Sequence, residues 1–422
     1  MGITSKYKYK PNRSTEYFSK LAKLVYLAGL PNFWIEELDL NRSFRKFYDY
    51  FVILVNSSIY ILVFLELAAF FTQHNLTAKQ NSDRLVFGLS QSIMVTYRLF
   101  VSFRCNKVKA LLFKMTVELK TVYNNKAIEQ YMIKKSKFYS ISFLCFCNVS
   151  LTFYGIDALM RSRKTGVVFS TLITAWPDIH DESATASAAR VVCYLGWWLF
   201  MTRIYGTFAL VLSLMVCLEH HYKNLAKYFQ DLAHIFRKDM NQLQKEKTYE
   251  KELIEGIKLH SETMWCKKQV QDICSMLFVG QILLNICVLV ILMSEMLKSD
   301  RSVETVFAAI TTCTATLVST ASFMWTAGDV TVQASHVHTA LYSSGWENCE
   351  LLTVSVGKLI VTAMIQAQLI GGDCGFLGTG VSQVGGITCG GQQYPRVLLT
   401  STSDSSSSSF NKGATSIMST GN

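Results

Sequence analysis

The sequence predicts an all-α membrane protein, a polytopic helical bundle with six clear spans and a cytoplasmic N-terminus. Half of the 422 residues are hydrophobic and only 17% are charged, whereas soluble globular domains average about 25% charged residues. Six apolar segments reach the roughly 20 residues that a helix needs to cross a bilayer. Lysine and arginine collect in alternate loops, which predicts the orientation.

The six apolar segments are predicted to be helices because backbone amides in lipid must be hydrogen-bonded within the segment. Three of them carry a charge that needs an explanation, since charged groups are costly inside a bilayer. Glu66 and Arg98 are close enough to span ends to reach the interface by snorkelling, whereas Arg203 lies mid-span and is expected to contact a ligand or a structural ion-pair partner. The predicted spans are 51–71, 85–103, 138–159, 191–218, 273–297 and 306–328.

The orientation follows from the basic residues of the loops. With the N-terminus inside, the cytosolic segments 1–47, 104–137 and 219–269 hold 28 lysines and arginines, and the outer loops 72–84, 160–190 and 298–302 hold 8. A chain with its N-terminus outside would invert this bias in every loop. The sequon at Asn75 falls in the first outer loop and is a candidate glycosylation site.

Two segments are predicted to form a cytosolic helical anchor, namely 219–269 and 329–368. In the first, apolar residues recur at helical spacing among many charges, which predicts helices that extend the fourth and fifth spans. In the second, 351–368 reads as one amphipathic helix. Together with the spans these segments make up one transmembrane domain, 1–368.

Aromatic residues collect near the outer end of the fourth span, where Tyr194, Trp197, Trp198 and Tyr205 lie close together. An interfacial aromatic belt or a packed core explains them as well as a pocket does. Other spans place mostly apolar residues at comparable depth, a composition that suits a small hydrophobic ligand. The candidate ligand-binding residues are Gln91, Met94, Phe153, Tyr154, Trp197, Trp198, Met201 and Thr312.

The sequence gives no sign of an enzyme. It contains no phosphate-binding loop, nucleophile elbow, zinc-protease or dinucleotide motif. His220 and His221 point about 100° apart on a helix, which favours a surface pair near the membrane over a metal site. The 12 cysteines include no CxxC pair. We therefore expect no metal, no cofactor and, without a basic soluble domain, no nucleic-acid partner.

Two short motifs point to a family. The segment Ala340-Leu-Tyr-Ser-Ser-Gly-Trp-Glu347, with Tyr342 and Trp346, and the segment Val361-Thr-Ala-Met-Ile-Gln-Ala-Gln368, with Gln366, resemble sequences around the last helix of insect odorant receptors. The second is similar to moth receptors, including the pheromone-receptor branch. The resemblance implies a seven-helix subunit of a ligand-gated, non-selective cation channel in the plasma membrane of sensory cilia or dendrites. It also implies a heterotetramer with a co-receptor, a volatile ligand bound in the outer half, and an anchor between subunits.

The chain departs from this family after Gln368. There the family continues into its seventh span, whereas residues 369–422 hold 11 of the 23 glycines and a serine run, a composition typical of a disordered tail. We expect the seventh span to be missing or replaced, through an alternative or mis-spliced end or a gene-model error, and such a chain to conduct poorly. A gustatory receptor of the same superfamily and a non-conducting truncated isoform remain alternatives. The charge bias opposes a G-protein-coupled receptor, and no internal repeat supports a transporter.

Overall fold

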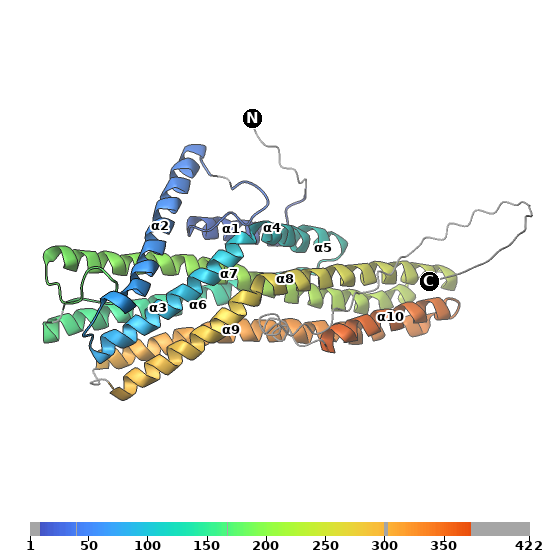
Figure 1. Ribbon diagram of the computed structural model, residues 1–422. Coiled ribbons are helices and arrows are strands. Elements are labelled where there is room, and N and C mark those ends of the chain that lie inside the picture. Colours follow the sequence, from blue (N-terminus) through green and yellow to red (C-terminus); the bar gives the residue numbers. More distant parts are fainter. Residues whose placement is uncertain (1–8, 39, 167, 299–302, 373–422) are drawn as a thin grey trace, which may run out of the picture.

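The computed structural model describes residues 9–38, 40–166, 168–298 and 303–372, which form an elongated helical bundle (Figure 1). Within this part of the chain, six helices are long and apolar enough to cross a membrane. Each contains one of the predicted spans, which confirms the predicted all-α bundle with six spans. The six are α2 (Arg42–Thr72), α3 (Ala78–Phe103), α6 (Lys126–Thr165), α7 (Ala184–Leu232), α8 (Gln242–Lys298) and α9 (Val303–Tyr342).

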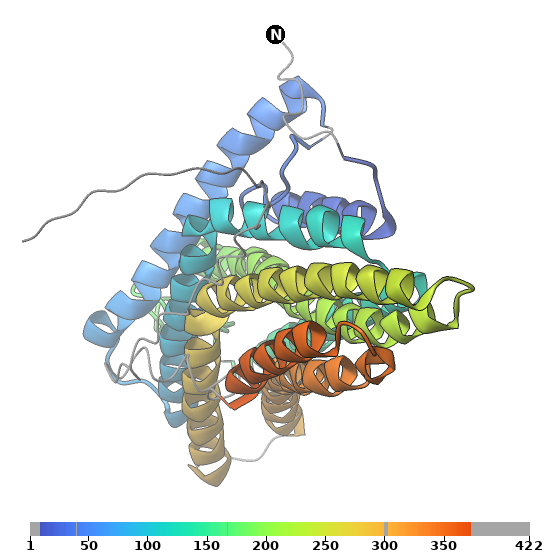
Figure 2. The same cartoon turned by 90° about the vertical axis from the view of Figure 1, so that its right-hand side faces the viewer.

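Shorter helices flank this bundle. In Figure 2, α1 and the α4–α5 segment lie together on one flank, and α10 lies beside α9 on the opposite side. The segment 105–122 is helical throughout and includes one π-helical turn. The shorter elements are α1 (Arg13–Leu27), α4 (Cys105–Phe113), η1 (Lys114–Glu118), α5 (Leu119–Val122), η2 (Ala233–Arg237), η3 (Trp346–Asn348) and α10 (Thr353–Gly372).

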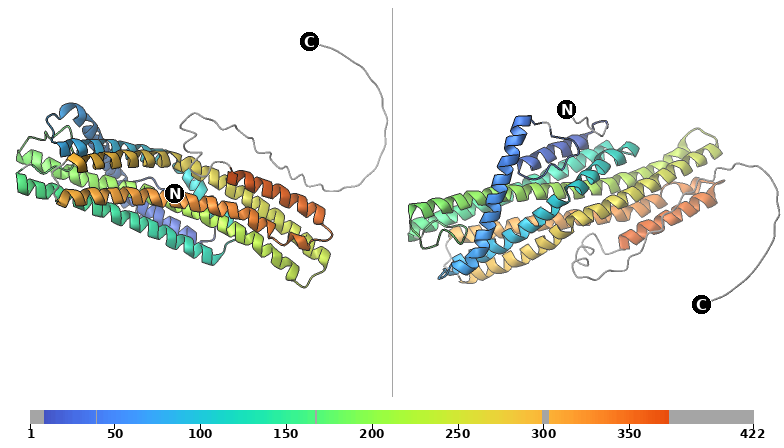
Figure 3. Two further views of the ribbon diagram at one scale, coloured as in Figure 1. Left: turned by 90° about the horizontal axis from the view of Figure 1, so that it is seen from below. Right: turned by 45° about the horizontal axis from the view of Figure 1, so that its top comes forward.

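The core is organised around α7, which packs extensively against α6, α8 and α9. From Phe208 to Leu218 nearly every side chain of α7 is buried, including the polar Ser213. By contrast α2 crosses the other helices obliquely (Figure 3, right) and exposes large apolar side chains such as Phe64 and Phe71. An apolar helix with little protein around it is typical of contact with lipid.

The predicted helical extensions are present. Helix α7 runs on to Leu232 and α8 begins at Gln242, so both continue well beyond their predicted spans. Helix α10 packs alongside α9 and α8 (Figure 3, left). It runs to Gly372, four residues past the predicted helix end at Gln368. The rest of the predicted tail, 373–422, lies outside the described residues.

Local capping explains where several helices begin and end. Thr77 and Gln80 form a reciprocal capping box at the start of α3, and Asn125 accepts two backbone N–H groups at the start of α6. Gly166 ends α6 with a φ of 71°, in the left-handed region that glycine tolerates best. These caps satisfy backbone groups that would otherwise lack partners at helix ends.

Candidate functional site

Three aromatic rings meet where α3, α6 and α7 pack together. Phe87, Tyr154 and Trp197 contact one another edge to face, with ring centroids 4.7 Å apart for Phe87–Trp197, 5.3 Å for Phe87–Tyr154 and 5.8 Å for Tyr154–Trp197. All three side chains are buried. Such pairs contribute about 0.5–1.5 kcal/mol each beyond the area they bury. We call these residues the three-ring cluster.

The cluster brings together two of the predicted ligand-binding residues, Tyr154 and Trp197, and adds one that the sequence analysis missed. Phe87 precedes the predicted residue Gln91 by four positions on α3. Residues four apart lie on the same face of a helix, so the helical spacing already contained the signal that could have identified Phe87.

Three other predicted residues surround the cluster without joining it. Phe153 stacks on Phe307 of α9, with centroids 6.0 Å apart. Trp198 contacts the ring of Tyr194 at 6.4 Å, and the hydroxyl of Thr312 lies 2.8 Å from that of Ser150. The Phe153 and Thr312 contacts join α6 to α9 beside the cluster, whereas the Trp198 contact lies within α7. Of the remaining three, Met94 is buried in the main hydrophobic core, Met201 is half-buried against that core, and Gln91 is fully buried on α3.

Charged groups border the cluster on one side. The ammonium of Lys79 lies 5.4 Å from the centroid of the Tyr154 ring and pairs with Asp83 at 3.0 Å. Arg161 pairs with Asp157 at 3.1 Å, and both carboxylates are buried. The candidate site therefore combines an apolar centre with charged groups beside it.

The snorkelling expected of Glu66 and Arg98 is wrong. Both side chains are buried, at 1% and 4% exposure, because α2, α3 and α7 pack together at their level. Arg98 donates to the side-chain oxygen of Asn56 at 2.9 Å, and Arg203 donates to the same oxygen at 3.0 Å. Both arginines are thus linked through an amide. Of the two partners predicted for Arg203, an ion pair is replaced by this amide contact, and a ligand contact stays a prediction.

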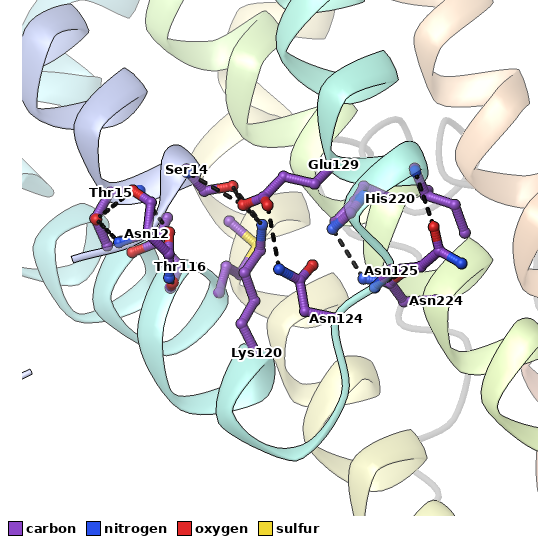
Figure 4. Close-up of polar contacts among 12 residues, drawn as sticks. Asn12, Ser14, Thr15, Thr116, Lys120, Asn124, Asn125, Glu129, His220 and Asn224 are labelled. Atoms are coloured by element: carbon purple, nitrogen blue, oxygen red, sulfur yellow. Dashed lines mark hydrogen bonds and ion pairs between the residues drawn. The ribbon is translucent and has the colours of Figure 1, made fainter. Parts of the chain in front are cut away.

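A second polar group joins α1, α5 and α6 (Figure 4). The carboxylate of Glu129 accepts hydrogen bonds from the Lys120 ammonium at 2.8 Å, from the Ser14 hydroxyl at 2.6 Å and from the Asn124 amide at 3.2 Å. The Lys120 and Glu129 side chains are only 2% and 3% exposed. A buried ion pair is tolerated when further hydrogen bonds satisfy it, and these residues meet that condition. We call Ser14, Lys120, Asn124 and Glu129 the buried junction.

The adjacent histidines lie beside this junction, and their expected surface position is wrong. His220 and His221 are 2% and 4% exposed. A ring nitrogen of His220 lies 2.9 Å from the Asn224 amide, and one of His221 lies 2.7 Å from the Met115 carbonyl. The 105–122 segment covers this part of α7 and explains the burial. Across the described residues, no group of three His, Cys, Asp or Glu side chains is arranged to hold a metal ion.

The predicted anchor contains a long-range helix cap. The carboxylate of Glu246 on α8 accepts the backbone N–H groups of Glu350, Leu351 and Leu352 at 2.8, 2.9 and 2.8 Å. Gln242 donates to the same carboxylate at 2.7 Å. Burial alone would raise the pKa of Glu246, but these donors hold it below its ordinary value. The carboxylate thereby fixes the start of α10 against α8.

The first family-like motif forms the turn that leads from α9 into α10. Gly345 has a φ of 89°, which suits glycine in a tight turn. The indole nitrogen of Trp346 donates to the carbonyl of Tyr342 at 3.1 Å, and the two rings lie 6.5 Å apart. Gln366 lies on α10. The motif therefore has a structural role in placing α10.

The candidate glycosylation site is accessible. Asn75 lies in the short connection between α2 and α3 and is exposed, with a φ of 57°. An exposed, irregular segment suits an acceptor asparagine.

The comparisons with known proteins agree with this architecture. The family model "7tm Odorant receptor" matches residues 92–368, about two thirds of the chain. The structure of the insect olfactory receptor OR5 from Machilis hrabei is similar, with a TM-score of 0.68 at 13% identity, covering 88% of this chain and 95% of that one. The same receptor in complex with eugenol gives a TM-score of 0.67 at 14% identity, with the same coverage. No curated protein matches. The chain belongs to the odorant receptor family.

Proposed function

We propose that the chain is the ligand-binding subunit of an odorant-gated, non-selective cation channel, and that it binds a small hydrophobic volatile at the three-ring cluster. The observation that carries this proposal is the cluster itself. Three buried rings from α3, α6 and α7 converge there, and the charged pair of Lys79 and Asp83 lies beside them. The structure of a similar receptor with eugenol supports a small organic ligand.

The chemistry of the cluster favours an apolar ligand of modest size. A ligand that enters between the rings exchanges ring–ring contacts for ring–ligand contacts of similar strength. Its net gain then comes from the apolar surface that it removes from water, about 25 cal/mol per Å². A volatile compound, which is small and largely apolar, meets this requirement. A strongly hydrated ligand would lose its water without an adequate replacement.

The same proposal places the N-terminus in the cytoplasm and the chain in the plasma membrane of sensory cilia or dendrites. The loop charge bias supports this orientation. The extended parts of α7, α8 and α9, together with α10, then form a cytosolic anchor that contacts the co-receptor in a heterotetramer. The similarity of 361–368 to moth receptors supports a pheromone as one ligand class.

The test is a recording of ligand-gated current from the chain expressed with the co-receptor. Two forms are compared, the chain as printed and a chain with a family-type seventh helix after Gln368, and surface biotinylation verifies delivery of both. We expect a volatile-gated cation current that requires the co-receptor, at least from the second form. Silence of both forms at the cell surface contradicts the proposal. A tastant-gated current without the co-receptor would support a gustatory receptor instead.

A further inference from the structure

Two buried polar side chains face each other where α2 and α3 pack. Glu66 and Gln91 are 1% and 0% exposed, and the carboxyl faces the amide. Neither oxygen of Glu66 and neither polar atom of the Gln91 amide makes a hydrogen bond of ordinary geometry. Each buried polar group without a partner costs about 1–3 kcal/mol. Such groups are rare in native proteins, and each calls for an explanation, such as a water molecule or a ligand that supplies the absent hydrogen bonds.

This polar pair lies close to the three-ring cluster along two helices. Gln91 follows Phe87 by one turn on α3. The thiol of Cys193 is near enough to Glu66 to interact with it electrostatically, and Cys193 precedes Trp197 by one turn on α7. Residues four apart share a helix face, and one turn spans about 5.4 Å. One small ligand can therefore reach both the rings and the polar pair.

The segment between α6 and α7 covers α2 at this level. The backbone N–H of Ala175 donates to the carbonyl of Leu65, the residue before Glu66, at 2.8 Å. The amide of Gln73 donates to the Thr174 carbonyl at 3.1 Å and accepts the Ile179 N–H at 3.2 Å. Together with the burial of both side chains, this cover limits the access of bulk water to the polar pair.

We propose that Glu66 and Gln91 form a subsite that binds the hydroxyl group of an alcohol or phenol ligand while its apolar part contacts the three-ring cluster. The Gln91 amide both donates and accepts hydrogen bonds, and the Glu66 oxygens accept them. A hydroxyl also both donates and accepts, so it matches the two side chains together. An ether or a carbonyl only accepts and leaves acceptor oxygens without a donor. The inference rests on the proposed function, since it names the ligand class of that site.

The test compares two isomers, 1-octanol and heptyl methyl ether, which differ in whether their oxygen can donate a hydrogen bond. Saturable binding is measured on the full-length receptor assembly in nanodiscs. We expect the wild type to prefer the alcohol by about tenfold or more, the equivalent of one to two hydrogen bonds. Glu66→Leu and Gln91→Leu should abolish this preference and keep the affinity for the ether. Glu66→Gln should retain most of the preference, because the amide oxygen still accepts a hydrogen bond from the hydroxyl.

A matched control is Asn148→Leu. Asn148 is a half-buried polar residue of α6 whose amide donates an exposed hydrogen bond to the carbonyl of Leu144. This variant should leave the alcohol preference unchanged. Equal binding of the two isomers by the wild type, or retention of the preference by both leucine variants, overturns the subsite alone. Absence of saturable binding of any volatile overturns the proposed function as well. If the wild type prefers a primary amine to the alcohol, and Glu66→Gln abolishes binding of that amine, the ligand group at this subsite is an ammonium paired with Glu66. That result overturns the hydroxyl assignment.

Discussion

The carboxylate of Glu246 is predicted to hold the N-terminus of α10 in place, and its removal should release that end. In Glu246→Ala, the N–H groups of Glu350, Leu351 and Leu352 lose their acceptor. Hydrogen bonds to charged groups contribute about 1.5–3 kcal/mol each. Leu351 is 63% exposed, however, so water replaces part of the loss. We expect a net cost of about 2–3 kcal/mol, which starts at the upper limit of about 2 kcal/mol for ordinary helix-cap substitutions.

Hydrogen–deuterium exchange measures this cost directly. Every 1.4 kcal/mol changes an equilibrium constant about tenfold, so the amides at 350–352 should exchange about 30- to 150-fold faster in Glu246→Ala. Glu246→Gln keeps the shape but turns one N–H₂ group toward the backbone donors, and it should show an intermediate increase. The matched control is Glu250→Ala, because Glu250 lies one turn further along α8 and accepts an exposed hydrogen bond from Ser355 at 2.8 Å.

The control should change exchange at 350–352 by less than about threefold, as expected for an exposed contact. If Glu246→Ala also stays within threefold of the wild type, the long-range cap does not hold α10. If Glu246→Gln matches the wild type, the negative charge plays no part in the cap.

The same structure makes four further predictions. Trp197→Leu should raise the volatile concentration for half-maximal response at least about tenfold with unchanged surface delivery, and an unaltered dose–response curve would place the ligand elsewhere. Lys120→Met should cost about 3–5 kcal/mol, because it leaves a buried carboxylate unpaired. The control is Lys227→Met, which removes a surface ion pair with Asp231 and should cost less than about 1 kcal/mol of stability. Thermal unfolding compares the two variants, and an equal loss of stability in both would contradict the role of the buried junction. The pKa of Glu246 is lowered in the folded protein, so its cap is fully stabilising above the ordinary value of 4.5 and is lost as pH falls through the lower folded value. Amide exchange at the start of α10 that does not change between pH 6 and 3, after correction for intrinsic rates, would contradict this role of the carboxylate. An antibody against an N-terminal epitope should stain only permeabilised cells, and staining of intact cells would contradict the predicted orientation. Asn75→Gln should remove a glycosidase-sensitive mass shift, since Asn75 then lies outside the cell.

The sequence predicted what depends on local patterns. The six spans follow from hydropathy, and the extensions of α7 and α8 follow from apolar residues at helical spacing, so both were found in the structure. Tyr154 and Trp197 were placed in the candidate site because they lie at similar depth in neighbouring spans. These inferences need only the length of a helix and the thickness of a bilayer.

The sequence failed where the result depends on how helices cross. Glu66 and Arg98 lie near span ends, yet the packing of α2, α3 and α7 buries both. His220 and His221 point apart on α7, yet other segments cover both sides of the helix. The Glu246 cap joins residues more than 100 positions apart, and nothing near Glu246 in the sequence identifies its partners.

The central claim is that a volatile ligand binds at the three-ring cluster, and photo-crosslinking tests it most directly. A photoactivatable, hydrophobic analogue of an active volatile is irradiated with the receptor assembly, and the labelled peptides are mapped by mass spectrometry. We predict labelling of peptides that contain Phe87, Tyr154 or Trp197, and loss of that labelling when an excess of the parent volatile is present. Labelling that is confined to the extended parts of α7–α10, or that the parent volatile does not reduce, would contradict the account.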